Sequence, residues 1–172
     1  MGKPRLSIDS VKYIPKPIGW TNDFVQLFSV SETQSLDSLI DKFEKETSVE
    51  ISVATVDSST RGPIELEPYT LLMARTWELG KKEKDNGILI VIAKDLRRIK
   101  IQNGYGIEKI LTNEETKIII DSTIVPLFKQ GRIYEGTREG ILAIMSKLKK
   151  NGLSHEGWQY GGFRIKFSTE HD

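Results

Sequence analysis

The longest uninterrupted apolar run of the chain, from Gly87 to Ala93, constrains its fold most. Residues 88–93 are apolar at every position, which is typical of a strand buried on both faces. After a short connection, residues 98–102 alternate between polar and apolar side chains. The two segments therefore predict an antiparallel hairpin. The apolar run is also far shorter than the roughly 20 residues that a membrane-spanning helix needs.

The predicted hairpin brings two polar turns to one edge of the sheet. Asp85-Asn86-Gly87 begins the first strand, and Asn103-Gly104-Tyr105-Gly106 ends the second. Thr112 and Glu115 have capping-box spacing, which predicts a helix that begins there and stops near Pro126. The amino end of this helix carries a partial positive charge near the same edge.

The other predicted elements alternate between helix and strand. Ser29 and Glu32 again have capping-box spacing, and Pro68 suits the first turn of a helix. In order, the periodicities predict a helix over 30–46, a strand over 49–56, a loop over 57–63, a helix from about Pro68 to Gly80, and a last helix that stops at 151–152.

The chain divides into three parts on these patterns. Residues 1–22 hold several prolines without a sustained period and predict an extended segment. Residues 23–150 carry all the predicted helices and strands and form the domain. The tail, residues 151–172, places aromatic side chains on both sides of Gly161-Gly162, which matches a β-hairpin or a cover for an apolar patch.

Composition excludes several classes of function. The chain has no cysteine, so thiol catalysis and cysteine-ligated zinc are excluded. Its 25 basic and 24 acidic residues give a net charge of +1, which does not favour nucleic acid as a partner. His155 and His171 both lie in the tail, so the domain holds no Ser-His-Asp triad. No signal-peptide pattern is visible, which places the chain as given in the cytoplasm, or in an exported or lumenal compartment if a signal segment was removed.

Oxygen ligands gather where the predicted elements converge. Asp85, Asn86, Glu108 and Asn113 lie on or just after these elements. Carboxylate and amide oxygens suit Ca²⁺ or Mg²⁺. The alternative is simple turn chemistry, because Asp, Asn and Gly form tight turns without any ligand.

These motifs together resemble the TPM domain family. The resemblance covers about residues 20–150. It rests on the order and spacing of Trp77, Gly80, Asp85-Asn86-Gly87-Ile88-Leu89, Arg97-Arg98, Gly104-Tyr105-Gly106-Ile107-Glu108, Pro126, Phe128, Gly131, Tyr134 and Gly136.

The resemblance implies a fold, an ion site and an activity. The fold is an α/β sandwich with a small central mixed sheet flanked by helices, which agrees with the predicted elements. The ion is calcium or magnesium, and plant members suggest an acid phosphatase. Asp23 and Asp85 match acidic positions of the family pattern, and Glu108 matches the acid after Gly-Tyr-Gly. Gln102 and Asn113 stand where the family usually has acids, which weakens the expected ion site.

Three hypotheses follow. The first is a soluble module for protein interaction or assembly that binds one Ca²⁺ or Mg²⁺ through Asp85 and Asp23, assisted by Glu108 or by the amides of Asn86 and Asn113. Gly87, Gly104, Tyr105 and Gly106 shape its partner surface. The second is a metal-assisted phosphatase with no assigned catalytic residue. The third is a structural domain whose aromatic tail docks on another protein.

Overall fold

The computed structural model describes residues 6–153, which fold around a four-stranded sheet. The strands lie in the order β1 (Thr21–Asp23), β2 (Glu50–Val56), β3 (Gly87–Ala93) and β4 (Arg98–Asn103). β1, β2 and β3 are parallel, and β4 is antiparallel to β3. The sheet is therefore mixed, as the sequence predicts.

The predicted hairpin is confirmed in place and direction. Ile88 pairs with Asn103, and Ala93 pairs with Arg98. Every residue of β3 is buried, because this strand has a neighbour on each side and helices on both faces.

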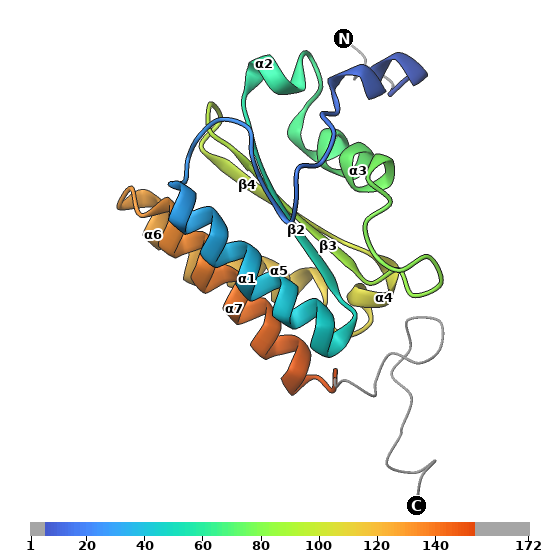
Figure 1. Ribbon diagram of the computed structural model, residues 1–172, viewed down its shortest axis with the longest axis vertical. Coiled ribbons are helices and arrows are strands. Elements are labelled where there is room, and N and C mark those ends of the chain that lie inside the picture. Colours follow the sequence, from blue (N-terminus) through green and yellow to red (C-terminus); the bar gives the residue numbers. More distant parts are fainter. Residues whose placement is uncertain (1–5, 154–172) are drawn as a thin grey trace, which may run out of the picture.

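Helices cover both faces of the sheet (Figure 1). α1 (Val30–Thr47) and α7 (Ile133–Lys150) pack against the side that holds Ile88, Ile90 and Ile92. α3 (Leu66–Thr76) packs against the other side, which holds Leu89, Val91 and Ala93. The alternation of strand side chains thus builds two apolar cores, and the predicted α/β sandwich is confirmed.

Both predicted capping boxes are present. The Ser29 hydroxyl accepts a hydrogen bond from the Glu32 amide at 3.1 Å, and the Glu32 carboxylate accepts one from the Ser29 amide at 2.8 Å. Thr112 and Glu115 make the same pair of bonds at the start of α5 (Asn113–Ile119). Each box satisfies two amide groups that have no partner within the helix.

Two local predictions are wrong. The helix that begins at Asn113 does not stop near Pro126, because a π-helical turn, η2 (Ile120–Ile124), leads directly into α6 (Val125–Lys129). Pro126 lies in the first turn of α6, where proline needs no backbone donor. The predicted loop over 57–63 contains a one-turn helix, α2 (Ser58–Arg61), which the Asp57 carboxylate caps.

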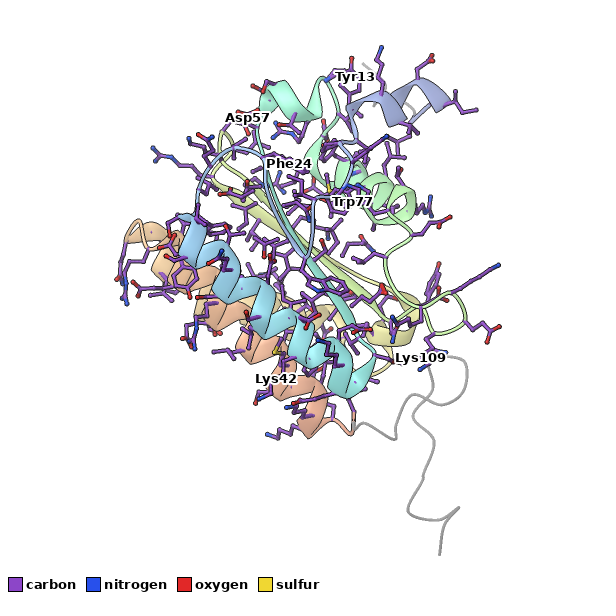
Figure 2. The ribbon with its side chains drawn as sticks, viewed as in Figure 1. Tyr13, Phe24, Lys42, Asp57, Trp77 and Lys109 are labelled. Atoms are coloured by element: carbon purple, nitrogen blue, oxygen red, sulfur yellow. The ribbon has the colours of Figure 1, made fainter. Side chains whose placement is uncertain are left out.

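The amino-terminal segment lies on the α3 side and carries two elements that the sequence pattern does not predict. These are a 3-10 helix, η1 (Ile8–Tyr13), and strand β1. The Tyr69 hydroxyl donates to the Tyr13 carbonyl at 2.9 Å, and the Trp77 indole donates to the Pro15 carbonyl at 2.8 Å. Figure 2 shows Tyr13, Phe24 and Trp77 on this side of the molecule.

The tail predicted to form a hairpin lies outside the described residues from position 154 on. Among residues 6–153, no helix combines the length and the apolar character that crossing a membrane requires.

Candidate functional site

The two predicted polar turns meet at the amino end of β3. The Gly104 amide donates to the Gly87 carbonyl at 2.8 Å, and the Gly106 amide donates to the Asp85 carbonyl at 3.0 Å. The Gly-Tyr-Gly motif then folds directly into a one-turn helix, α4 (Tyr105–Glu108). The predicted convergence of these turns is therefore confirmed.

Glycine is required where the two turns meet, because main-chain atoms of neighbouring segments lie too close together to leave room for a Cβ atom. A Cβ atom at Gly104 would come within 2.2 Å of the Asp85 carbonyl oxygen. A Cβ atom at Gly87 would come within 2.6 Å of the Leu79 carbonyl oxygen, and one at Gly80 within 2.6 Å of the Gly87 nitrogen. Real Cβ atoms do not approach so closely, so these three glycines allow three segments to join.

Asn86 stabilises this junction from inside. Its side chain is fully buried. The amide oxygen accepts a hydrogen bond from the Lys81 amide at 2.8 Å, and the amide nitrogen donates to the Ser48 carbonyl at 2.9 Å. The oxygen expected to assist an ion is thus engaged within the protein, and Asn86 has a structural role.

A groove of 770 Å³ lies beside the junction, between the end of α3, the loop before β3, and α4. Gln102 contributes from β4, and Tyr105 from α4, with 73% of its surface exposed. The groove is mixed in charge and partly apolar. Its other lining residues are Leu71, Ala74, Arg75, Glu78, Leu79, Gly80, Lys81, Lys82, Asp85, Gly87, Asn103, Gly104 and Glu108.

Asp85 and Glu108, two of the predicted ligands, line this same groove. Asp85 is exposed and has a φ of 47°, a left-handed conformation that Asp tolerates better than most residues. Glu108 lies at the end of α4 and is half-buried. The junction therefore presents two carboxylates from different turns to one opening.

Two lysines hold the loop that precedes β3. The Lys81 ammonium lies 2.8 Å from a Glu44 carboxylate oxygen and 3.2 Å from a Glu50 oxygen, which raises the pKa of Lys81. Burial, together with the charge of Lys81, lowers the pKa of Lys84, whose ammonium donates to the Ser48 hydroxyl. Lys81 thus fastens the loop to α1 and β2.

Asp23 does not share this site, contrary to expectation. It pairs with Thr55 in β2, whereas Glu50 of β2 pairs with Gly87. The five-residue offset corresponds to about 17 Å along the strand, so Asp23 and Asp85 lie at opposite ends of the sheet. The Asp23 carboxylate accepts hydrogen bonds from the amides of Leu27 and Phe28, and from the Thr55 hydroxyl. It stabilises the turn after β1.

Asn113 also lies away from the groove. It is the exposed first residue of α5 and does not line the opening. The start of α5 instead faces the end of α7, because the Asn151 amide donates to the Ile110 carbonyl at 2.6 Å and approaches the Glu115 carboxylate at 3.3 Å. The fold therefore does not bring the Asn113 amide into the groove beside Asp85, where it was expected to assist an ion.

One wall of the groove comes from α3, which the sequence pattern does not link to the predicted site. Leu71, Ala74 and Arg75 follow the spacing of one face of α3, and Glu78 lies just after the end of that helix. The helix face can be recognised from this spacing in the sequence. Its position beside Asp85 follows only from the packing of α3 in the structure.

The opposite end of the sheet holds an ion pair. Arg61 is 5% exposed, and its guanidinium donates to both Asp95 carboxylate oxygens at 2.8 and 2.9 Å. This bond lowers the pKa of Asp95. Figure 2 shows Asp57, at this end, far from Lys109 beside α4. Asp57 and Asp95 therefore stabilise α2 and the β3–β4 turn.

The carboxylates of the described residues do not form a ready-made metal cluster. Glu78, Asp85 and Glu108 all line the groove, yet within residues 6–153 no three His, Asp or Glu side chains lie close enough together to hold a metal ion.

The mixed sheet, the two helical layers and the glycine junction define a small α/β domain with a groove at the amino end of its central strand. The family model of the TPM domain matches residues 21–147. The chain belongs to the TPM domain family.

Solved structures share this fold. The N-terminal domain of a P. gingivalis protein is 30% identical, with a TM-score of 0.69 over 86% of this chain and 88% of that one. The BA42 protein from Bizionia argentinensis is 21% identical, with a TM-score of 0.66 over 79% of this chain and 88% of that one. The N-terminal domain of a Corynebacterium glutamicum protein is 16% identical, with a TM-score of 0.54 over 80% and 82% of the two chains. The comparison with curated proteins gave no match.

Proposed function

We propose that this TPM domain is a module for protein interaction that receives its ligand in the groove beside Asp85 and binds one Ca²⁺ or Mg²⁺ there. The observation that carries the proposal is that Asp85 and Glu108, from two separate turns, line one groove. The hydrogen bonds between the turns keep these residues near each other. Asp85 and Glu108 are the proposed ligands.

The donor set suits a weak site. Two carboxylates, with the Gln102 amide in the same groove, supply oxygen ligands, and water completes the coordination. Arg75 and Lys82 line the groove as well, and their charges oppose a cation. We therefore expect dissociation constants of the order of millimolar.

The rest of the groove suits a protein segment as the partner. Tyr105 is exposed at its edge, while Leu71 and Leu79 provide apolar surface. Exposed tyrosine and arginine side chains are the types that contribute most to protein interfaces. The ion would then connect the groove to an acidic or carbonyl group of the partner.

The proposal is tested by amide NMR titration of the EDTA-treated protein with Ca²⁺ and then Mg²⁺. Saturable shifts at 85–87 and 104–108 support it, and Asp85→Asn should abolish them. The control is Asp121→Asn, which removes an exposed carboxylate from η2 and should leave the shifts intact. An absence of shifts at millimolar ion, or an unchanged response of Asp85→Asn, excludes the site.

A metal-assisted phosphatase is the second candidate, because Arg75 and Lys82 line the same groove as the carboxylates and would bind phosphate oxygens. Since the chain has no cysteine, the nucleophile would be water or a carboxylate. Mg²⁺-dependent hydrolysis of p-nitrophenyl phosphate that is lost in both Asp85→Asn and Arg75→Ala would support this function. Hydrolysis that persists in Asp85→Asn would indicate a contaminant.

A further inference from the structure

A second groove, which we name the η1 groove, lies far from the glycine junction. Its volume is 540 Å³, and it runs between η1 and the start of α3. Its apolar lining comes from Leu6, Tyr13, Pro63, Ile64 and Pro68. Aromatic and proline side chains lose little conformational entropy when a ligand covers them, so this lining is well suited to binding.

The surface next to the η1 groove is unusually apolar. Leu6, Ile8 and Val11 are 40%, 92% and 42% exposed, and they are three of the eight large hydrophobic residues that are exposed in the described part of the chain. They lie on or beside one short 3-10 helix. A concentration of exposed apolar side chains marks an interaction surface.

The rim of the η1 groove is acidic. Asp9, Glu65 and Glu67 line it, whereas Lys12 is the one basic residue of its lining. The Lys12 ammonium lies 5.2 Å from the centre of the Tyr13 ring, and Glu67 pairs with Arg98. The remaining negative charge, on Asp9 and Glu65, favours a cationic and apolar ligand.

The chain itself contains a segment with this chemistry. Residues 163–167 read Phe-Arg-Ile-Lys-Phe. In an extended conformation, three apolar side chains lie on one face of such a segment and two cations on the other. By contrast, residues 1–5, which directly precede the groove, offer only Met1 and Pro4 as apolar side chains.

We propose that the η1 groove binds residues 163–167 of a second copy of this chain. The apolar face of the segment covers Tyr13 and Ile64, and its cations meet Asp9 and Glu65. This contact joins the tail of one copy to the groove of another, either reciprocally in a two-fold dimer or head to tail in an open chain.

The positions of the two sites favour a second copy over the same copy. Leu153, the last described residue, lies two positions after Asn151, whose side chain donates to the Ile110 carbonyl. Figure 1 shows the helix of residues 8–13 at one end of the longest axis and the end of α7 toward the other. The η1 groove, which this helix lines, also includes Glu67, the partner of Arg98. Nine residues separate Leu153 from Phe163, so even a fully extended chain places these two residues at most about 36 Å apart.

The test is the self-association of the full chain, measured by sedimentation velocity across a range of concentrations at low and high salt. We expect concentration-dependent association that high salt weakens. Arg164→Glu in the tail and Glu65→Lys in the groove should each weaken it by on the order of tenfold. The double variant exchanges the two charges and should regain much of the association. Glu114→Lys, an exposed glutamate at the start of α5, is the matched control and should have no effect.

Three outcomes overturn the proposal. The first is a chain that stays monomeric at high concentration. The second is association that Glu65→Lys leaves unchanged, which places the contact on another surface. The third comes from comparing amide NMR spectra of wild type and Arg164→Glu. If the signals of Tyr13 and Ile64 differ between the two proteins by the same amount at low and high protein concentration, the tail binds the groove of its own copy.

Discussion

At the scale of single residues, Gly104 permits the close approach of the two turns beside the groove. Because a Cβ atom there would lie 2.2 Å from the Asp85 carbonyl oxygen, we expect Gly104→Ala to separate the turns and to lower the free energy of unfolding by roughly 1–3 kcal/mol. Denaturant unfolding measures this change. The control is Gly19→Ala, where the nearest atom lies 3.9 Å from the new Cβ. Equal effects of the two substitutions would contradict the argument from close approach.

A second residue-scale prediction concerns Asp95 and its bond to buried Arg61. Asp95→Asn leaves the guanidinium without its charged partner and should lower the free energy of unfolding by roughly 2–3 kcal/mol at neutral pH. Glu67→Gln, which breaks an ion pair that is about half exposed on both sides, should cost less than about 1 kcal/mol. Unfolding of both variants in urea tests this ranking.

The effect of Asp95→Asn should also depend on pH in a defined direction. Arg61 holds the pKa of Asp95 below its ordinary value of 3.8. A carboxylate whose pKa falls on folding stabilises the protein fully above its unfolded pKa, and this contribution is lost as the pH drops through the folded pKa. The stability difference between wild type and Asp95→Asn should therefore be constant above about pH 5 and shrink below pH 4. A difference that grows in acid would contradict this assignment.

At the scale of elements, Tyr69 of α3 and Trp77, the residue that follows α3, hold the amino-terminal segment through single hydrogen bonds. Trp77→Phe keeps the aromatic ring beside Phe24 but removes the donor to the Pro15 carbonyl, at a cost of about 1 kcal/mol. The amides of Ile18 and Gly19, which donate to the Asn22 side chain, should exchange faster with deuterium. Tyr105→Phe, whose parent side chain is exposed, should leave this exchange unchanged. Equal exchange in wild type and Trp77→Phe would show that the bond contributes nothing.

Helices and strands long enough to show a periodic pattern are predictable from the sequence, whereas very short ones are not. The capping boxes at Ser29 and Thr112 mark real helix starts, and the run from Gly87 to Ala93 forms the central strand. Strand β1 has three residues, too few to show a period, and its pairing depends on Asn22, which donates to Ser52 and to the Val53 carbonyl. Because β1 was not predicted, its parallel direction was unknown. The sequence therefore does not give the end of the sheet at which Asp23 lies, and only the family resemblance lists it among the ligands.

At the scale of the whole molecule, the topology separates Asp23 from Asp85, the two acids that the family resemblance assigns to one ion site. The β3–β4 hairpin brings the Asp85 turn beside the turn that leads to Glu108, because antiparallel strands return the chain to the same end of the sheet. The parallel strands β1 and β2 instead end together, at Asp23 and Thr55. The direction of strand pairing therefore decides which carboxylates share the proposed ion.

This separation predicts how the ion changes the stability of the whole domain. An ion that binds only the folded protein stabilises it by about 1.4 kcal/mol when its free concentration is ten times the dissociation constant. The free energy of unfolding should thus rise with Mg²⁺ or Ca²⁺ in wild type and stay flat in Asp85→Asn. Asp23→Asn should lower stability at every ion concentration, since it weakens the turn after β1, yet keep the ion-dependent rise. Unfolding in urea at constant ionic strength distinguishes these cases, and loss of the rise in Asp23→Asn alone would place the ion at the carboxyl ends of the parallel strands.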